Sequence, residues 1–413
     1  MLASFHYSFD QSPVILSQIS PTQENHYLHT FHLSLSTFLV FIGWNSLGPM
    51  LTPIFGALGA MTLSARMIAL ALGSVVVAPC MIQYLGVRKC LIVGLFGYTL
   101  FPLSLLDPSG SLMILCGIAA GTGGSIFLNA QSLFASKAST HQTIGIHNGI
   151  FFTSLLGTNL VGNSLSYMVL AHYPLTYWLM IGSGLAAVGV LISLFLPTAE
   201  DSSGSAQLST PPEDAPSALQ TLQLIWQMVC SSRRLQLYTP AMMWQGLAFA
   251  LWVTWFPTNV LAPCYGVSAI GIYMSSYGAS NALGSLLAGI AVSRLSRRTV
   301  WLCGVMLTSV LGVAWCALLA GHCQPVAHYL IAALMGLEDA SVNHVFGSAI
   351  ATHFSQSLAQ MSYAAGWWRL ILGLTAFTVM LTAYHLPMTL VVTMTAMAAL
   401  GSTALFIAAE SVQ

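Results

Sequence analysis

The stretch of residues 174–216 reads PLTYWLMIGSGLAAVGVLISLFLPTAEDSSGSAQLSTPPEDAP. Its first part, residues 174–196, is apolar and uncharged. That length is enough for an α-helix to cross the hydrocarbon core of a bilayer, which takes about 17–25 residues. From Pro197 onward, serine, proline and acidic residues replace the apolar ones, which is typical of a polar connection. The stretch therefore predicts a membrane-spanning helix followed by a flexible cytosolic linker at 197–234.

The rest of the chain repeats this apolar pattern. Only 5% of the 413 residues are charged and 56% are hydrophobic, whereas about a quarter of a soluble domain is charged. Backbone groups in lipid must satisfy one another, and the sequence has no alternating barrel strands of about ten residues. We therefore predict an all-α integral membrane protein that contacts the lipid bilayer. Its twelve transmembrane helices are expected at 33–53, 63–84, 90–106, 111–134, 143–171, 174–196, 235–261, 268–293, 299–321, 325–353, 360–384 and 387–409.

The linker divides these helices into two sets of six. We expect a cytosolic tail, two bundles and a short C-terminus at 1–32, 33–196, 235–409 and 410–413. A glycine-to-basic turn follows the second helix of each bundle, with Gly86, Arg88 and Lys89 in the first and Gly289, Arg294, Arg297 and Arg298 in the second. Two parallel six-helix repeats describe the major facilitator fold, and these turns resemble its cytosolic signature. An unrelated twelve-helix transporter is the alternative fold.

The basic residues also predict orientation. Lys and Arg occur in the loops near residues 88, 137, 233 and 297, whereas the loops at the opposite helix ends have none. Because basic loops remain in the cytosol, both termini of this multi-pass protein are expected there. The sequence leaves open whether the membrane is the plasma membrane or an endomembrane. The first 32 residues lack the pattern of a cleaved signal peptide.

Signatures of several other protein classes are missing from the sequence. It has no Walker A loop, and no Ser-His-Asp set or metal-ligand cluster can be identified, so we expect no enzyme activity, no cofactor and no metal. The net charge is zero and there is no basic tract for nucleic acid. Among the eight cysteines, Cys264 and Cys323 are both expected on the outer side. Free thiols are the favoured interpretation there, and a disulfide between them is the alternative.

Several short motifs occur in a familiar order. They are Trp44-Asn45-Ser46-Leu47, Gly121-Thr-Gly123-Gly124 leading to Asn129-Ala130-Gln131, Tyr277-Gly278 leading to Gly289, and Gly336-Leu-Glu338-Asp339 leading to Asn343. Together they resemble the Unc-ninety-three-like family of major facilitator proteins. Gly48 and Glu338 depart from the family pattern, which indicates a distant member. The resemblance implies regulation of potassium channels, potassium homeostasis, chaperoning of membrane receptors, or solute transport.

Three ionisable residues are expected at membrane depth, where such groups are costly and often functional. Glu338 and Asp339 lie near the middle of the tenth helix, and Arg369 lies in the eleventh. Two adjacent buried carboxylates disfavour each other's charge, so one could carry a proton or coordinate a cation. Arg369 is the expected counter-ion, which leaves one acid uncompensated. A purely structural pairing is the alternative. Arg66 is expected to extend toward the outer interface.

Uncharged polar residues occur in the first, fourth, seventh and tenth helices, which line the central cavity in the major facilitator fold. The candidate cavity residues are Asn45, Asn129, Gln131, Gln245, Asn343 and His344. Interhelical hydrogen bonding is the alternative role. Asn281 is expected to be a packing residue.

These observations favour a secondary transporter that moves a small solute or ion by alternating access. The alternative is a non-transporting subunit that regulates a potassium channel or assists the trafficking of another membrane protein.

Overall fold

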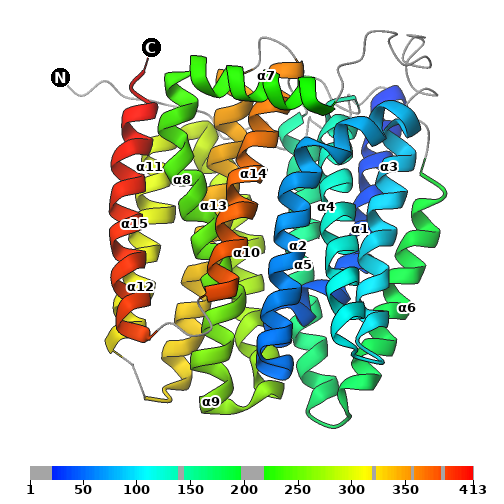
Figure 1. Cartoon of the computed structure of the whole chain (residues 1–413), viewed down its shortest axis with the longest axis vertical. Coiled ribbons are helices and arrows are strands. Elements are labelled where there is room, and N and C mark those ends of the chain that lie inside the picture. Colours follow the sequence, from blue (N-terminus) through cyan, green and yellow to red (C-terminus); the bar gives the residue numbers. More distant parts are fainter. Residues whose placement is uncertain are drawn as a thin grey trace.

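The computed structural model describes residues 21–137, 144–196, 218–318, 322–354, 358–382 and 387–412, and it is helical throughout apart from short turns (Figure 1). The helices before residue 200 are α1 (Pro21–Phe55), α2 (Ala57–Val75), α3 (Val77–Ser104), α4 (Gly110–Lys137), α5 (Ile144–Leu170) and α6 (Leu175–Ser193). Those after it are α7 (Ala218–Ser231), α8 (Arg233–Ala250), the π-helical η2 (Leu251–Trp255) and η3 (Pro257–Leu261), α9 (Ala262–Tyr265), α10 (Val267–Arg294), α11 (Arg297–Trp301), the π-helical η4 (Leu302–Leu307), α12 (Thr308–Leu318), α13 (Pro325–His353), α14 (Leu358–Thr382) and α15 (Met388–Ala409).

These elements make twelve passes through the bundle within the described ranges. The second pass runs through α2 into the start of α3 and ends at Gly86, whose φ of 76° breaks the helix. Glycine tolerates this backbone conformation because it has no Cβ. The segments from α8 to α9 and from α11 to α12 each form one pass. The all-α membrane fold predicted from the sequence is confirmed.

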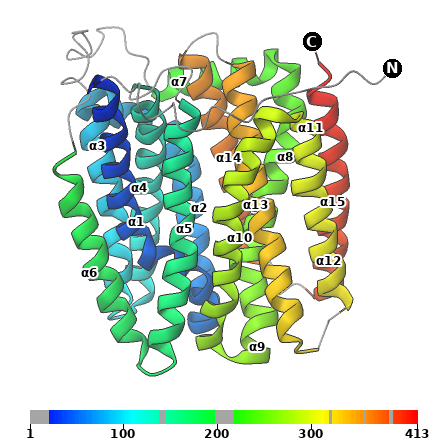
Figure 2. The same ribbon diagram turned by 180° about the vertical axis from the view of Figure 1, so that it is seen from behind.

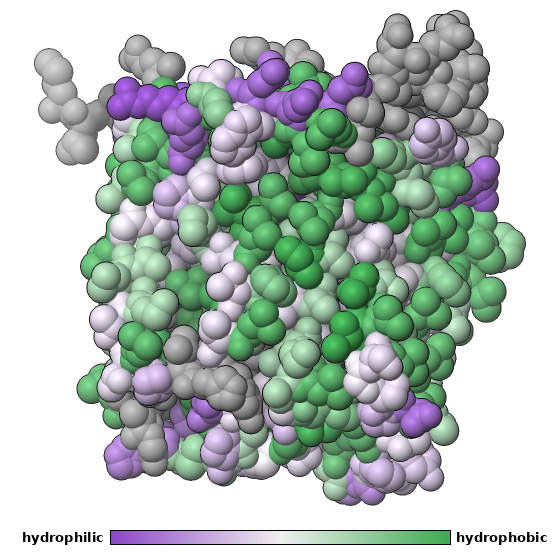
Figure 3. Space-filling model, viewed as in Figure 1, coloured by the Kyte–Doolittle hydropathy of each residue, from purple (hydrophilic) through white to green (hydrophobic). Residues whose placement is uncertain are grey.

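The outer surface suits a bilayer. In the face that Figure 3 shows, hydrophobic residues cover the middle and hydrophilic residues gather toward the two ends. Nine helices in the described part of the chain are long and apolar enough to cross a membrane. The other long helices, α5, α10 and α13, have 27, 28 and 29 residues and contain buried polar residues such as Asn163, Asn281 and Glu338. α10 packs on both α5 and α13, so the polar side chains can point into the bundle while apolar ones such as Leu160 and Leu283 stay exposed on its surface.

The buried apolar side chains form two separate clusters. One draws almost entirely on residues 33–196, and the other almost entirely on residues 225–409. The two halves meet along two seams, which Figures 1 and 2 show from opposite sides: α2 packs on α14, and α5 packs on α10. A Cβ on Gly278 of α10 would overlap the backbone at Leu160 of α5, so this seam depends on glycine.

Part of the predicted linker is ordered. Residues 218–231 form α7, which lies across one end of the bundle in Figure 1 and packs on helices of both halves, including α2 and α14. The prediction of a flexible segment is wrong for these residues, because buried Ile225 and Val229 anchor the helix. Residues 197–217 of the linker lie outside the described residues. The predicted tail at 1–32 also differs, since α1 begins at Pro21.

Candidate functional site: a central cavity between the halves

A cavity of about 1700 Å³ lies between the two halves. Side chains from both line it, from α1, α2, α4 and α5 on one side and from α8, α10, α13 and α14 on the other. A pathway between the halves near mid-membrane is the general arrangement for carriers built from two repeats.

The cavity extends toward only one end of the bundle. Its lining on α5 comes from residues 149–159, on α13 from 339–351 and on α14 from 361–372. In each helix this is the part nearer to α7, and Thr221 and Ile225 of α7 also line the cavity. On α1 the lining stops at Pro49, before the helix ends at Phe55. The cavity is therefore accessible from the end that carries α7.

All six polar residues selected from the sequence as cavity candidates line this space: Asn45, Asn129, Gln131, Gln245, Asn343 and His344. Several also bond to neighbouring helices. Asn45 donates to Thr158 of α5 at 2.6 Å, and the side-chain oxygen of Asn129 accepts a bond from Arg369 of α14 at 2.8 Å. The cavity role and the interhelical role thus occur together in the same side chains.

Asp339 lines the cavity and accepts hydrogen bonds from three neutral side chains. Tyr277 and Asn281, both on α10, donate to Oδ2 at 2.8 Å each, and Asn343, one turn along α13, donates to Oδ1 at 3.1 Å. Hydrogen bonds to a charged group are stronger than those between neutral groups, so this set stabilises a carboxylate. Tyr277 was not among the site residues predicted from the sequence, and Asn281 was expected to be a packing residue. Their spacing of four residues, which places them on one helix face, was the available signal.

The polar network continues from Asn343 across the C-terminal half. Gln245 of α8 donates to Oδ1 of Asn343 at 3.0 Å, and its own carbonyl oxygen accepts a 2.6 Å bond from the Trp368 indole of α14. Three helices are thereby joined at the depth of Asp339. If α8 or α14 moves relative to α13, these hydrogen bonds must either break or be carried along with the moving helices.

Glu338 points away from the cavity. Consecutive residues of an α-helix project about 100° apart, so the two acids cannot share one face. Glu338 is 2% exposed, and its Oε2 accepts a 3.0 Å bond from the indole of Trp252. The predicted pair of acids thus separates into one residue that lines the cavity and one that is enclosed within the C-terminal half.

Arg369 does not pair with either acid, so the predicted counter-ion role is wrong. Its guanidinium instead reaches across the cavity to α4, where it donates to Asn129 Oδ1 at 2.8 Å and to the Leu128 carbonyl at 3.2 Å. The physical reason is geometric: Arg369 lies on the seam between α14 and α2, within reach of the other half. Asp339 has its own neutral donors and does not need this arginine.

The depth of Arg66 in the membrane differs from the depth predicted from the sequence. This residue was expected at the outer end of a helix starting at 63, but α2 starts at Ala57, about 9 Å further out at 1.5 Å per residue. Arg66 consequently lies deep in the bundle, lines the cavity and is 8% exposed. Its guanidinium lies 4.4 Å from the centroid of the Trp44 ring, within the range of a cation–π contact.

The two glycine-to-basic turns lie at the end of the bundle toward which the cavity extends. In the first, Gly86 makes the break described above, Arg88 donates to the Leu194 carbonyl at 2.7 Å, and Lys89 is exposed. This bond joins the turn to the residue that follows α6, and Leu85 and Val87 of the same turn pack against the apolar core of that half.

The second turn is held by a larger set of contacts. Arg297 forms a 3.1 Å ion pair with Glu410, Arg298 donates to Ser411 at 2.8 Å, and Arg294 is exposed. Gly289 lies deeper and lines the cavity beside His344. The turn between the second and third passes of this half is therefore fastened to the end of α15.

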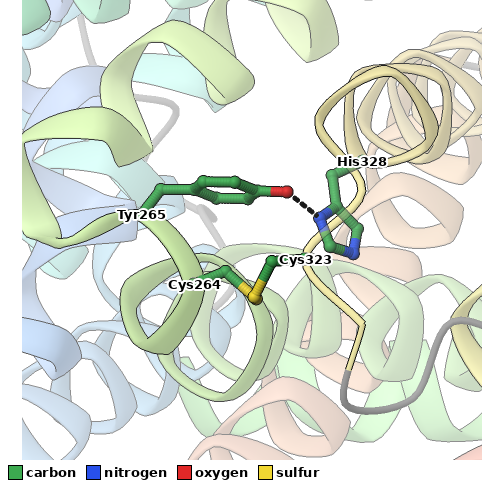
Figure 4. Close-up of a disulfide and its surroundings, with 4 residues drawn as sticks. All are labelled: Cys264, Tyr265, Cys323 and His328. Atoms are coloured by element: carbon green, nitrogen blue, oxygen red, sulfur yellow. Dashed lines mark hydrogen bonds between the residues drawn. A yellow bond between two sulfur atoms is a disulfide. The ribbon is translucent and has the colours of Figure 1, made fainter.

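The opposite end of the C-terminal half is crosslinked. Cys264 at the end of α9 forms a disulfide with Cys323, just before α13, with a Cα–Cα distance of 5.4 Å (Figure 4). The expectation of free thiols is wrong, because the fold brings the ends of two passes together. Beside the disulfide, the hydroxyl of Tyr265 and Nδ1 of His328 lie 2.9 Å apart (Figure 4).

The fold and the cavity define a class of membrane proteins, and comparison with known families agrees. The family model of the Major Facilitator Superfamily matches residues 33–337, and the chain belongs to that superfamily. Two solved structures share the fold. They are a mutant form of the nucleoside transporter NupG (TM-score 0.64, 16% identity, 93% of this chain and 100% of that one) and the partially occluded inward-open xylose transporter XylE from E. coli (0.64, 13%, 92% and 97%).

Within the superfamily, the chain is similar to Unc-93-like proteins, which confirms the resemblance noted in the sequence. It is 25% identical over 345 residues to "UNC93-like protein 3" of Arabidopsis thaliana, covering 78% of this chain and 73% of the relative. It is 23% identical over 359 residues to "Putative potassium channel regulatory protein unc-93" of Caenorhabditis elegans. That match covers 74% of this chain and half the length of the nematode protein.

Proposed function

We propose that this protein is a secondary transporter that moves a small solute or ion by alternating access. The observation that carries the proposal is the cavity of about 1700 Å³ between the halves, which reaches mid-bundle from one end only. Toward the other end the halves pack closely, because Gly271 of α10 leaves no room for a Cβ against the Asn163 carbonyl of α5, at 2.6 Å. One open and one closed end is the arrangement that alternating access requires.

Asp339 is the proposed coupling residue. It faces the cavity, it belongs to the C-terminal half, and its hydrogen-bond donors carry no charge. A carboxylate in this setting gains from binding a proton or a cation, because an isolated charge in the membrane interior is costly. Glu338, enclosed beside Trp252, is proposed to have a structural role.

The end of the bundle that carries α7 and the basic turns is proposed to face the cytosol. Basic loops are retained on the cytosolic side, and Arg88, Arg297 and Arg298 all lie at this end. Both termini would then be cytosolic, and the cavity would be open to the cytosol. A membrane-impermeant reagent should label cysteines introduced at positions 88 and 298 only from the cytosolic side. Labelling of the two positions from different sides would contradict this orientation.

The function is tested by flux into proteoliposomes that contain the purified protein alone. We expect gradient-driven movement of potassium, measured with radioactive rubidium, or of protons, measured with an internal pH dye. Protein-free liposomes are the control. No flux of either ion would contradict the ion-coupled transporter.

A second candidate is a regulatory subunit of a channel, which the name of the nematode relative favours. A protein of this kind would show no flux by itself. It would change the current of a co-expressed potassium channel. Flux by the protein alone in the liposome experiment would dismiss it.

A further inference from the structure

Arg66 carries a charge that the proposed transport cycle does not yet use. It lies in α2, on the cavity wall contributed by the N-terminal half, and its side chain is more than nine-tenths buried. The ion pairs in the described part of the chain join Arg297 and His353 to Glu410, far from this position. Arg66 is therefore a buried cation with no carboxylate partner among the described residues.

Its neighbours leave much of its hydrogen-bonding capacity free. A guanidinium has five N–H donors. Nη2 donates to the Tyr98 hydroxyl at 3.3 Å, Nη1 contacts the Met67 sulfur at 3.4 Å, and Nε has no partner. Both contacts are long, and a thioether is a weak acceptor. A buried donor without an acceptor costs free energy, so this arrangement is suited to an acceptor supplied by a ligand.

The surroundings hold this arginine in one place. Its guanidinium lies 4.4 Å from the Trp44 ring centroid and 5.8 Å from that of Tyr98. The glycines of α4 make room for it, since a Cβ on Gly121 would overlap the Arg66 carbonyl and one on Gly124 would overlap the Tyr98 hydroxyl. The glycine-rich motif of the fourth pass thereby gains a specific purpose: it lets α4 approach the wall that holds the cation.

Arg369 provides the contrast. That cavity arginine is bonded to Asn129 and the Leu128 carbonyl, which are strong oxygen acceptors of the protein itself. Arg66 has only a distant hydroxyl and a sulfur. Of these two cations, Arg66 has the greater unused capacity for an anion.

We propose that Arg66 binds the carboxylate of an amphipathic organic monocarboxylate, the substrate class of the transporter proposed above, on which this inference rests. The planar fork of arginine matches the two oxygens of a carboxylate. The cavity wall around it is apolar, with Phe38, Phe41, Leu63 and Leu70, and suits an aromatic or aliphatic body. Asp339 on the opposite wall disfavours a second negative charge on the ligand.

The test is direct binding to the purified full-length protein in detergent, with radiolabelled benzoate and octanoate as probes. Saturable binding of at least one probe is expected. Benzamide, which has the shape of benzoate without its charge, should compete poorly. Arg66→Gln should weaken binding about tenfold or more, because it removes charged hydrogen bonds. Arg66→Lys, which keeps the charge but not the fork, should bind with intermediate affinity. The matched control is Arg298→Gln, which lies outside the cavity and should bind as the wild type does.

Tyr98→Phe keeps the aromatic ring and frees Nη2 of Arg66, so it should retain or strengthen binding. This variant tests the proposal if Arg66→Gln does not fold. Four results would overturn the proposal. Two concern the wild type: no saturable binding of either probe, or equal competition by benzamide. Two concern folded variants: unchanged affinity in Arg66→Gln, or loss of binding in Tyr98→Phe. Because this assay measures no flux, the two proposals separate. Binding without ion flux would support the carboxylate site and contradict ion-coupled transport, and ion flux without binding would do the reverse.

Discussion

The two halves of this bundle treat their buried charges in opposite ways. The N-terminal half presents Arg66 to the cavity on a surface of aromatic rings, with a weak set of hydrogen-bond acceptors. The C-terminal half presents Asp339 on a surface of hydroxyl and amide groups, with three side-chain donors. One half therefore holds a cation with acceptors in short supply, and the other an anion that accepts three side-chain hydrogen bonds.

The difference extends to the ends of the halves. The C-terminal half is closed on one side by the Cys264–Cys323 disulfide and on the other by the contacts of Arg297 with Glu410. At the turn of the N-terminal half, Arg88 donates to the Leu194 carbonyl, and Leu85 and Val87 pack against the apolar core. Two repeats with one architecture thus use different polar contacts at their basic turns, and the C-terminal half has a disulfide as well.

The largest expected effect on ion flux comes from Asp339→Asn. The amide can still accept from part of the donor set, so the fold should survive, but the charge that attracts a cation or proton is lost. Ion flux in proteoliposomes should fall about tenfold or more, which corresponds to losing about 1.5–3 kcal/mol from a charged hydrogen-bonded contact.

Glu338→Gln is the matched control for this change. It neutralises the adjacent acid, which lies outside the cavity, and its amide oxygen can still accept from Trp252. Flux should stay close to that of the wild type. Equal loss in both variants would show that the two acids act together and would remove the distinction between cavity and interior drawn here.

The second effect concerns the disulfide between Cys264 and Cys323 in the C-terminal half. Cys264→Ser opens a crosslink between residues 59 apart in sequence, and loop-closure entropy allows a loss of up to about 4 kcal/mol in the free energy of unfolding. Thermal unfolding in detergent should occur at a lower temperature. Cys303→Ser, at an exposed free cysteine of the same half, should change it little. Equal unfolding temperatures of the two variants would mean that the disulfide does not stabilise this half.

The smallest effect concerns the contact between the halves. Arg369→Gln should lose the bonds to Asn129 and the Leu128 carbonyl, which join α14 to α4 in this arrangement. At about 1.5 kcal/mol, the ratio of this conformation to the opposite one should fall roughly tenfold. Spin labels at Phe195 and Leu295, exposed on different halves at the end that carries α7, would report the distance distribution in a background without the six free cysteines.

Arg298→Gln should leave that distribution unchanged, because its bond to Ser411 stays within one half. If Arg369→Gln also leaves it unchanged, Arg369 does not hold the halves together, and its contact with Asn129 is incidental to the conformational change.

Much of the fold could be predicted from the sequence because lipid imposes strong constraints. Uncharged apolar stretches of spanning length had to be helices, and the repeated turns at Gly86 and Gly289 indicated two related halves. Polar residues at helix interiors, such as Asn343 and Gln245, pointed to the cavity because a polar group in lipid is costly.

The details of the site could not be predicted in the same way. An error of nearly two turns in the start of α2 placed Arg66 at the membrane interface instead of in the cavity. The expected partnership of Arg369 with Asp339 rested on charge alone, and charge does not specify which helix face points to which neighbour. For the same reason, the sequence could name Cys264 and Cys323 as candidates without deciding between thiols and a disulfide.

Composition and spacing by themselves determined that this protein resides in a membrane, that it is helical and which family it resembles. These properties depend on summed hydrophobicity and on the order of short motifs along the chain. Only the tertiary structure decided which buried charge faces which neighbour: Arg66 against Trp44, Arg369 against Asn129, and Asp339 among its neutral donors. These pairings depend on the rotation and depth of each helix within the bundle. Packing across the seams sets both, through contacts between residues far apart along the chain.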